Sequence, residues 1–414
     1  MKVEQTSGEN QRKDVLPTAP IHEMQMWAQA HLIAAKNRLK TACRYQNDRP
    51  RLRDEFPNLY LTQKWLATQQ SAEATHLCIS YTEQLYPYLQ EQGYNADLLQ
   101  WCKDSIRACD SLERNASFFY YLLGDTSHAL GAWDDAARYT EQAIQLSKGS
   151  DEKTYARSNL LKGRIQFSQG AYPSALSTLA QAEQLLLQQK DYENFVRAKL
   201  EIVSYYSNKG DFDAALAGYQ ELETFQKEKG EMTFMSYTLL MIGVSYRQKK
   251  QYEQAKTYFL HALEYSKARQ HRRDTATNYH HLAWVYVDQG ELRQAQAFCD
   301  KSLTLYKETG DNRGVADVYE QLGCIMQRSN YFQEAAMYFH QSLNLHRQIG
   351  SRRGIASSLR RLGVLYMKYG HLFKGSVYLY KSLTAYHRLG ILDRKRIVFI
   401  LNEIWKPSSH LKMG

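Results

Sequence analysis

Histidines gather in one part of this chain and raise the question of a metal site. Six of the 13 histidines lie between His261 and His346. Imidazole is a common ligand of transition metals, but several ligands must converge on one ion. His280 and His281 are adjacent, so on a helix their side chains point about 100° apart. His340 and His346 diverge in the same way. The spacing therefore predicts no metal site.

Carboxylates that could serve acid–base catalysis also lack a catalytic arrangement. Asp134 and Asp135 stand at the expected start of a helix, where the helix dipole favours acidic side chains. The chain contains no G-x-S-x-G, no H-E-x-x-H and no G-x-x-x-x-G-K-[ST]. We therefore expect no catalytic residues, no enzymatic activity and no bound cofactor.

The six cysteines show no C-x-x-C spacing and no tight cluster. We expect them to be free thiols, mostly buried, in a reducing compartment. The N-terminal residues lack the apolar core of a signal peptide, and the apolar runs fall short of the roughly 20 residues that span a bilayer. The expectation is a soluble, cytoplasmic protein without a membrane partner.

Positive charge is concentrated at the C-terminal end. The formal net charge is +10, and residues 340–414 alone contain 14 Lys and Arg against Asp393 and Glu403. This asymmetry favours an acidic partner at that end, whether an acidic peptide or a nucleic acid. A solvated basic face without a ligand is the alternative. The candidate basic patch consists of Arg352, Arg353, Arg361, Arg394, Lys395 and Arg396.

The elements that position these residues are expected to be helices. Only seven prolines occur, and Pro173 is the only one between Pro87 and Pro407. Sandwiches, barrels and βαβ folds recruit proline into their turns, so this pattern favours an all-α protein.

A repeat of 40 residues organises most of the chain. Small or short residues recur at intervals of 39 and then five times 40, at Gly124, Gly163, Val203, Gly243, Ala283, Gly323 and Gly363. A small residue follows each of them after 12 positions (Ala136, Ala175, Ala215, Ala255, Ala295, Ala335 and Gly375), and between the two columns stands a bulky one (Trp133, Tyr172, Phe212, Tyr252, Leu292, Phe332 and Leu372). We expect each unit to be two helices, A and B, with the bulky residue opening helix B and filling the gap to the next pair. The turn between helices A and B is expected two residues before each bulky residue, at Gly131, Gly170, Gly210, Lys250, Gly290, Asn330 and Gly370. Glycine and asparagine, which fill six of these seven positions, tolerate left-handed backbone angles.

The pattern L-G-x-x-Y/x-x-x-x-G-x-Y/F-x-x-A resembles the tetratricopeptide repeat (TPR) in its long, 40-residue form. That form is found in spindle-orientation scaffolds, in Rap-type peptide-sensing regulators and in the sensor halves of STAND nucleotide-switch proteins. The resemblance implies a right-handed superhelical α-solenoid and a role in binding proteins or peptides. It also implies that the A helices line the concave face.

The organisation expected along the chain follows from this register. A disordered tail (1–20) precedes an N-terminal helical segment (21–72), a degenerate TPR-like unit (73–115) and seven repeats (116–390). A capping helix (391–405) is expected to cover the last repeat with Ile397, Val398, Leu401 and Ile404, and a tail (406–414) ends the chain.

Positions on the A helices define a candidate groove for a partner segment, and Asp317, Glu320 and Ser357 fall on groove-facing positions as well. Aromatic, amide and guanidinium groups together suit a peptide that carries carboxylates. The candidate groove residues are Arg157, Arg164, Arg197, Asn208, Tyr237, Arg247, His280, Trp284, Gln327, Arg328, Arg360 and Lys368.

Three hypotheses for function remain. The first is a non-enzymatic scaffold, the sensor or adaptor subunit of a regulatory system, that binds a protein or peptide in the groove. The second is binding of a nucleic acid or another acidic partner through residues 340–414. The third is a Rap-like regulator of a signalling partner. The oligomeric state does not follow from the sequence.

Overall fold

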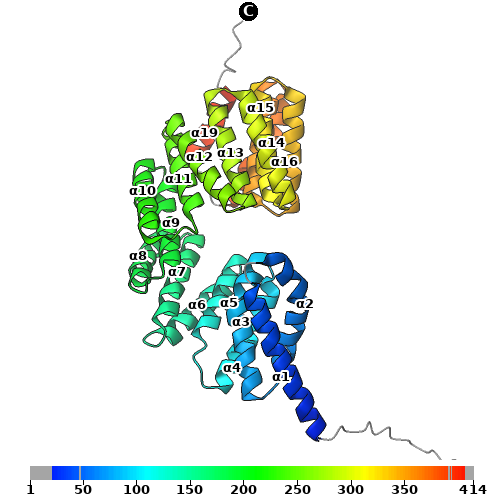
Figure 1. Ribbon diagram of the computed structural model, residues 1–414. Coiled ribbons are helices and arrows are strands. Elements are labelled where there is room, and N and C mark those ends of the chain that lie inside the picture. The colour runs from blue at the N-terminus through cyan, green and yellow to red at the C-terminus, as the bar shows by residue number, and fades with distance from the viewer. Residues whose placement is uncertain (1–20, 46–47, 390–391, 393, 406–414) are drawn as a thin grey trace, which may run out of the picture. The chain divides into compact units, whose positions relative to one another are not determined.

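The fold is all-α throughout the described part of the chain. The computed structural model describes residues 21–45, 48–389, 392 and 394–405, and every regular element in these ranges is an α-helix. The helices belong to two compact units, one ending at Gln189 and one starting at Lys190 (Figure 1). The expected tails, 1–20 and 406–414, lie outside the described residues.

The first unit begins with α1 and α2, which pack on each other and on α3, and it continues with the helix pairs α3–α4, α5–α6 and α7–α8. Its helices are α1 (Ile21–Arg44), α2 (Arg49–Leu66), α3 (Ala72–Gln92), α4 (Asn95–Ser111), α5 (Ser117–Ala129), α6 (Trp133–Ser147), α7 (Glu152–Ser168) and α8 (Tyr172–Gln188). Between α3 and α4, Gly93 has a φ of 75°, in the left-handed region.

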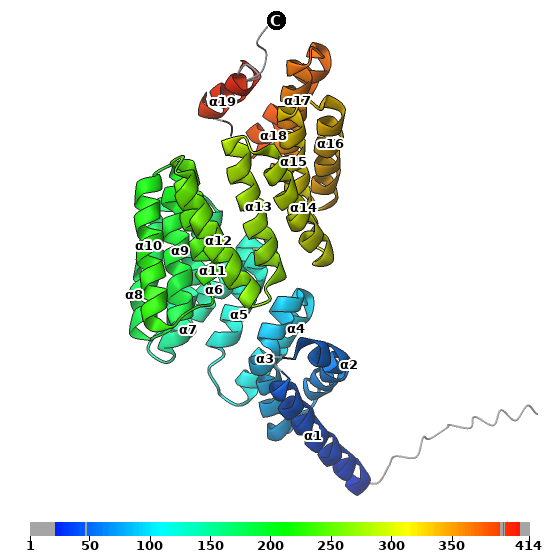
Figure 2. The same cartoon turned by 45° about the horizontal axis from the view of Figure 1, so that its top comes forward.

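The second unit stacks five helix pairs and ends with a single helix (Figure 2). Its helices are α9 (Tyr192–Lys209), α10 (Phe212–Lys229), α11 (Met235–Gln248), α12 (Tyr252–Ala268), α13 (Arg272–Gln289), α14 (Leu292–Glu308), α15 (Asn312–Arg328), α16 (Phe332–Gln348), α17 (Arg352–Lys368), α18 (Leu372–Arg388) and α19 (Arg394–Trp405). Each pair packs against the next, as in an α-solenoid.

The register predicted from the repeat is confirmed. All seven B helices, the even-numbered helices from α6 to α18, begin at the predicted bulky residue. All seven predicted turn positions have a positive φ, including the non-glycine residues Lys250 (61°) and Asn330 (64°). The left-handed angle ends each A helix and lets the chain reverse within about three residues.

Where the small residue of an A helix is glycine, it allows close contact with the B helix of the same pair. At Gly243, a Cβ atom would lie 2.6 Å from the ring of Phe259, which is fully buried. At Gly323 it would lie 2.5 Å from the ring of Phe339. The following small column is buried too, with Ala255 fully inaccessible to solvent. The small residues at these positions thus stand where an A helix and a B helix approach closely.

The bulky residue that begins each B helix was expected to fill the gap to the next helix pair, and this expectation is wrong at three positions. Trp133, Tyr172 and Leu372 are 40%, 43% and 62% exposed, so they do not fill a gap between helix pairs. Phe332 does pack, against the rings of Tyr366 and Tyr369.

The prediction that α19 covers the last repeat with Ile397, Val398 and Leu401 is wrong as well. Ile397, Val398 and Leu401 are 41%, 46% and 48% exposed, whereas Ile400 is buried. The helix packs on α17 through a different side, because Glu403 is drawn to two arginines of α17.

Five of the six cysteines are buried and all six are free thiols. No described helix combines the length and the apolar character needed to cross a bilayer.

Candidate functional site

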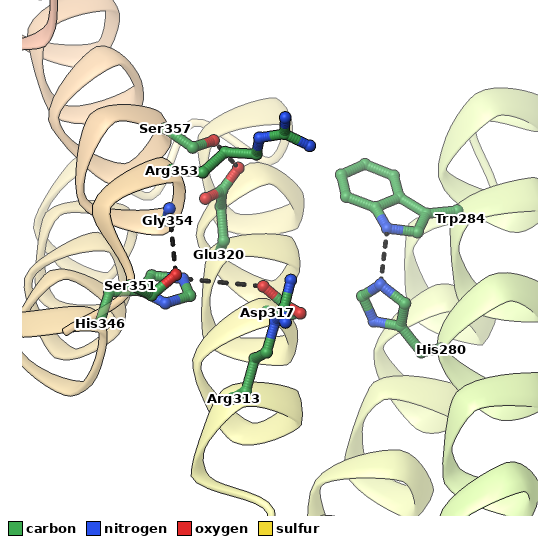
Figure 3. A pocket seen from close by; sticks show the side chains of 10 residues that line it. All are labelled: His280, Trp284, Arg313, Asp317, Glu320, His346, Ser351, Arg353, Gly354 and Ser357. Carbon is green, nitrogen blue, oxygen red and sulfur yellow. Dashed lines mark hydrogen bonds and ion pairs between the residues drawn. The ribbon is translucent and has the colours of Figure 1, made fainter. Parts of the chain in front are cut away.

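A cavity of about 300 Å³ opens between three A helices of the second unit. His280 and Trp284 line it from α13, while Arg313, Asp317 and Glu320 line it from α15 (Figure 3). The remaining wall is the turn from α16 into α17, with His346, Ser351, Arg353, Gly354 and Ser357. Consecutive repeats therefore supply equivalent helices to one site.

Trp284 is held in place from two sides. Its Nε1 donates a hydrogen bond to Nε2 of His280 at 3.1 Å, and the guanidinium of Arg247 lies 5.4 Å from its ring centroid. Arg247 in turn forms an ion pair with Asp288 at 2.7 Å. Burial and the positive charge of Arg247 lower the pKa of His280 to about 4, so its ring is neutral at pH 7. The indole is thus a fixed apolar wall of the cavity.

Glu320 is fully engaged by α17. Its Oε1 accepts hydrogen bonds from Ser357 Oγ at 2.9 Å and from Arg361 Nε at 3.1 Å. Burial alone would raise the pKa of Glu320, but Arg361 and Arg360 hold that pKa below its usual range. Its neighbour Arg361 stays charged because the surrounding carboxylates outweigh burial and raise its pKa. This carboxylate is therefore structural, joining two repeats.

Asp317 lies on the open side of the cavity. Its Oδ1 is 3.7 Å from Nε2 of His346, and half of its side chain is exposed. Partial desolvation in the concavity, together with the Glu320 charge, raises the pKa of Asp317 to about 6. Burial lowers the pKa of His346. A Cβ at Gly354 would lie 2.3 Å from Nδ1 of His346, so glycine is needed where α17 passes this ring.

Two cations of the cavity form no ion pair within the described residues, although the charge of Arg313 acts on the nearby Asp317 carboxylate. Arg313 and Arg353 are exposed, and neither forms an ion pair within the described residues. Unpaired guanidinium groups beside a fixed indole can bind a carboxylate and an apolar side chain together.

Of the twelve groove candidates, only His280 and Trp284 line this cavity. All twelve lie on odd-numbered helices, the A helices of the repeats, with Arg157 and Arg164 in the first unit and the others in the second. Arg164 pairs with Asp125 at 3.1 Å. Arg360 is buried and pairs with Glu403.

The other candidates are dispersed along the second unit. Arg197 pairs with Glu193 and lies over the ring of Phe234. Arg328 donates a hydrogen bond to the carbonyl oxygen of Val287. Four further candidates lie elsewhere on these helices: Asn208 on α9, Tyr237 on α11, Gln327 on α15 and Lys368 on α17.

The candidate basic patch does not form one surface of free charges. Arg361 is partly buried between Glu320 and Glu403, whereas Arg352 and Arg353 are exposed in the first turn of α17. The backbone of Arg394, Lys395 and Arg396 forms the first turn of α19, but their side chains lie outside what the structure describes.

Sequence reasoning missed Arg313, His346, Ser351 and Gly354 as cavity residues. Arg313 lies four positions, about one helical turn, before Asp317, which was expected to face the groove. A second small column was available as a signal for Gly354, because Gly314 precedes it by 40 residues and meets the ring of Tyr306 in the same way.

The first unit has an open hollow of its own, about 450 Å³ in volume, lined from α4, α5 and α6. Lys103, Arg107, Tyr120 and Tyr139 contribute polar and aromatic groups to it. Arg107 is paired with Asp104, and Arg138 lies over the ring of Tyr139. Lys103 is thus the one lining cation of this hollow that forms no ion pair within the described residues, whereas the cavity of the second unit has two beside a fixed indole, so the latter is the stronger candidate.

Comparisons with known proteins agree with this architecture. Residues 234–308 match the family model of the tetratricopeptide repeat. No curated protein matches the sequence of the chain. Among solved structures, the apo form of the quorum sensor NprR from B. thuringiensis is similar, with 16% identity, a TM-score of 0.57 and coverage of 87% of this chain and 99% of that one.

Two further structures share the fold. The Rap conjugation gene regulator of the plasmid pLS20, in complex with the Phr* peptide, has 15% identity and a TM-score of 0.56 and covers 83% of this chain and 97% of that one. The STAND protein PH0952 from Pyrococcus horikoshii, with a tetratricopeptide repeat sensor, has 15% identity and a TM-score of 0.56. The match covers 84% of this chain and 55% of that one. Residues 234–308 thus match the tetratricopeptide repeat, and the chain shares its fold with a Rap regulator, NprR and a STAND protein with a tetratricopeptide repeat sensor.

Proposed function

We propose that this chain is a non-enzymatic regulator, a sensor or adaptor subunit, that binds a segment of a protein or peptide on the A helices of its second unit. The fold it shares with a quorum sensor and with a peptide-bound Rap regulator supports a peptide as the ligand. Those structures are related to this one in fold only, so the chemistry of the ligand must come from the residues of this chain.

The observation that carries the proposal is the pair of unpaired cations, Arg313 and Arg353, facing the fixed indole of Trp284 across one cavity. A peptide that presents an acidic side chain or its terminal carboxylate would form charge-assisted hydrogen bonds with these guanidinium groups. An adjacent apolar side chain of the same peptide would pack on Trp284.

The size of the cavity limits what enters it. A volume of about 300 Å³ is at the small end of ligand pockets. It suits one or two side chains of a peptide, and the rest of the segment would follow the neighbouring A helices.

The test compares a library of fluorescein-labelled octapeptides with free C-termini and the same library amidated, by fluorescence anisotropy on the full chain. We expect peptides with a carboxylate to be preferred. Arg353→Gln should weaken the best peptide about tenfold or more, because a hydrogen bond to a charged group contributes roughly 1.5–3 kcal/mol. Arg293→Gln on α14, an exposed arginine outside the cavity, is the matched control. Equal binding by the wild type and the Arg353 variant would refute the proposal.

The alternative, a nucleic acid on the basic end, makes a different prediction. Binding to phosphates weakens steeply with salt because counterions are released. The combined replacement of Arg394, Lys395 and Arg396 by Gln would then lower the salt dependence and weaken binding to every sequence alike. Under the peptide proposal this triple variant keeps most of its peptide affinity.

A further inference from the structure

The last helix of the chain lies on an A helix. α19 packs on α17 through Phe399, Ile400 and Glu403. Glu403 forms ion pairs with both Arg360 and Arg361, the second at 3.2 Å. The ring of Phe399 lies 5.5 Å from the guanidinium of Arg360. Because Phe399 and Glu403 are four positions apart, both reach the arginines from one side of α19.

The two arginines differ in what they need from α19. Arg361 also pairs with Glu320 of α15, so it has a partner within the repeats. Arg360 is only 7% exposed, and Glu403 supplies the only carboxylate that pairs with it within the described residues. This burial is the state with α19 in place. Because a guanidinium covered without an anion is costly, a segment that covers Arg360 in place of α19 must bring a carboxylate.

The attachment of α19 is limited. The helix has 12 residues, a length that is marginal for an isolated helix in water. Phe399 is itself 55% exposed, Ile397, Val398 and Leu401 are also about half exposed, and Ile400 is buried. Removing α19 therefore uncovers little apolar surface besides that of Phe399 and Ile400, and a competitor has few contacts to replace.

The α19 site is connected to the cavity. Glu320 lines the cavity and pairs with Arg361, which pairs with Glu403. If another segment replaces Glu403 as the partner of Arg361, the change therefore acts on the cavity wall through one residue, Glu320.

We propose that Arg360 and Arg361 form a carboxylate-binding site for a helical partner segment with an aromatic residue four positions before a Glu or Asp, and that α19 occupies this site as an internal competitor. The proposal rests on the proposed function, namely that A helices of the second unit bind protein segments. It adds a second contact point, the chemistry of the segment that fits it, and a means of regulation. While α19 is bound, the partner must compete with a tethered segment whose effective concentration is of about millimolar order.

The test uses the full chain and a labelled synthetic peptide with the sequence of residues 394–405 as the probe. Fluorescence anisotropy compares the wild type with the double variant F399A/E403Q, in which the internal competitor is weakened. We expect the double variant to bind the probe at least tenfold more tightly. The same probe with Gln in place of its Glu should bind the double variant at least tenfold more weakly, and so should the unchanged probe when R360Q is added to the double variant.

A control variant separates this site from other effects. R347Q on α16 removes an exposed positive charge and should leave binding of the probe unchanged. The two proposals fail in different measurements: the octapeptides and R353Q test the cavity, whereas the 394–405 probe and R360Q test the α19 site. Hydrogen exchange of the α19 amides should become faster in E403Q. Equal binding of the probe by the wild type and the double variant, or equal binding of the Glu and Gln probes, would overturn the proposal.

Discussion

Trp284 donates a hydrogen bond from its indole nitrogen to Nε2 of His280, one turn earlier on α13, at 3.1 Å. Since Nε2 accepts this bond, the proton of the neutral imidazole sits on Nδ1. Nδ1 is buried and has no hydrogen-bond partner within the described residues. The hydrogen bond therefore orients the indole toward the cavity and leaves one buried donor of His280 without a partner among the described residues.

The first prediction concerns the pH dependence of stability. The pKa of His280 is lowered from 6.5 to about 4 by burial and by Arg247. In the unfolded chain His280 becomes protonated below about pH 6.5, whereas in the folded chain it becomes protonated only below about pH 4. The free energy of unfolding therefore decreases as the pH falls through this window. His280→Gln, whose amide oxygen can still accept from Trp284, should reduce this loss by roughly 1–2 kcal/mol between about pH 7.5 and about pH 5. Urea unfolding at both pH values measures it, and an unchanged loss would contradict the assignment.

A second prediction addresses Arg247 and Trp284. The cation–π contact and the ion pair of Arg247 with Asp288 make these residues act together. We expect the effects of Arg247→Ala and Trp284→Ala on the free energy of unfolding to be non-additive by roughly 0.5–2 kcal/mol. Urea unfolding of the wild type, both single variants and the double variant provides the cycle. Strict additivity would mean that Arg247 does not support the indole.

The third prediction tests the repeat register through packing. Ala255 is fully buried in α12. Ala255→Leu should overpack the contact between α12 and its partner helix and cost roughly 1–3 kcal/mol. Ala268→Leu, at the exposed last position of the same helix, is the control and should have little effect. Both are read from thermal and urea midpoints, and similar midpoints for the two variants would place Ala255 outside the helix contact.

The fourth prediction uses a backbone angle. Lys250 has a φ of 61°, in the left-handed region that disfavours side chains. Lys250→Gly should therefore stabilise the chain by about 0.5–1 kcal/mol, the relief of strain exceeding the entropy that glycine adds to the unfolded chain. Gln248→Gly, in the last turn of α11, should instead destabilise it by up to about 1 kcal/mol. A loss of stability in both variants would argue against strain at Lys250.

The local features of this protein follow from its sequence. The spacing of small and bulky residues located the start of every B helix, from Trp133 to Leu372, and the turn before it, even where Lys250 and Asn330 replace glycine. These features depend on neighbours within one helical hairpin, where side-chain size and backbone angles decide the geometry. A fixed period makes such short-range rules visible in a sequence.

The functional surface depended on contacts that the period does not encode. Arg360 was expected to face a ligand, but it forms an ion pair with Glu403, a residue 43 positions away in the sequence. Arg361 was assigned to an open basic patch, and Glu320 and Glu403 enclose it instead. Whether an arginine on an A helix is free or paired is decided by side chains from the next repeat and from α19. Only the tertiary structure brings those carboxylates within reach, and within the described residues it leaves Arg313 and Arg353 exposed and without an ion pair.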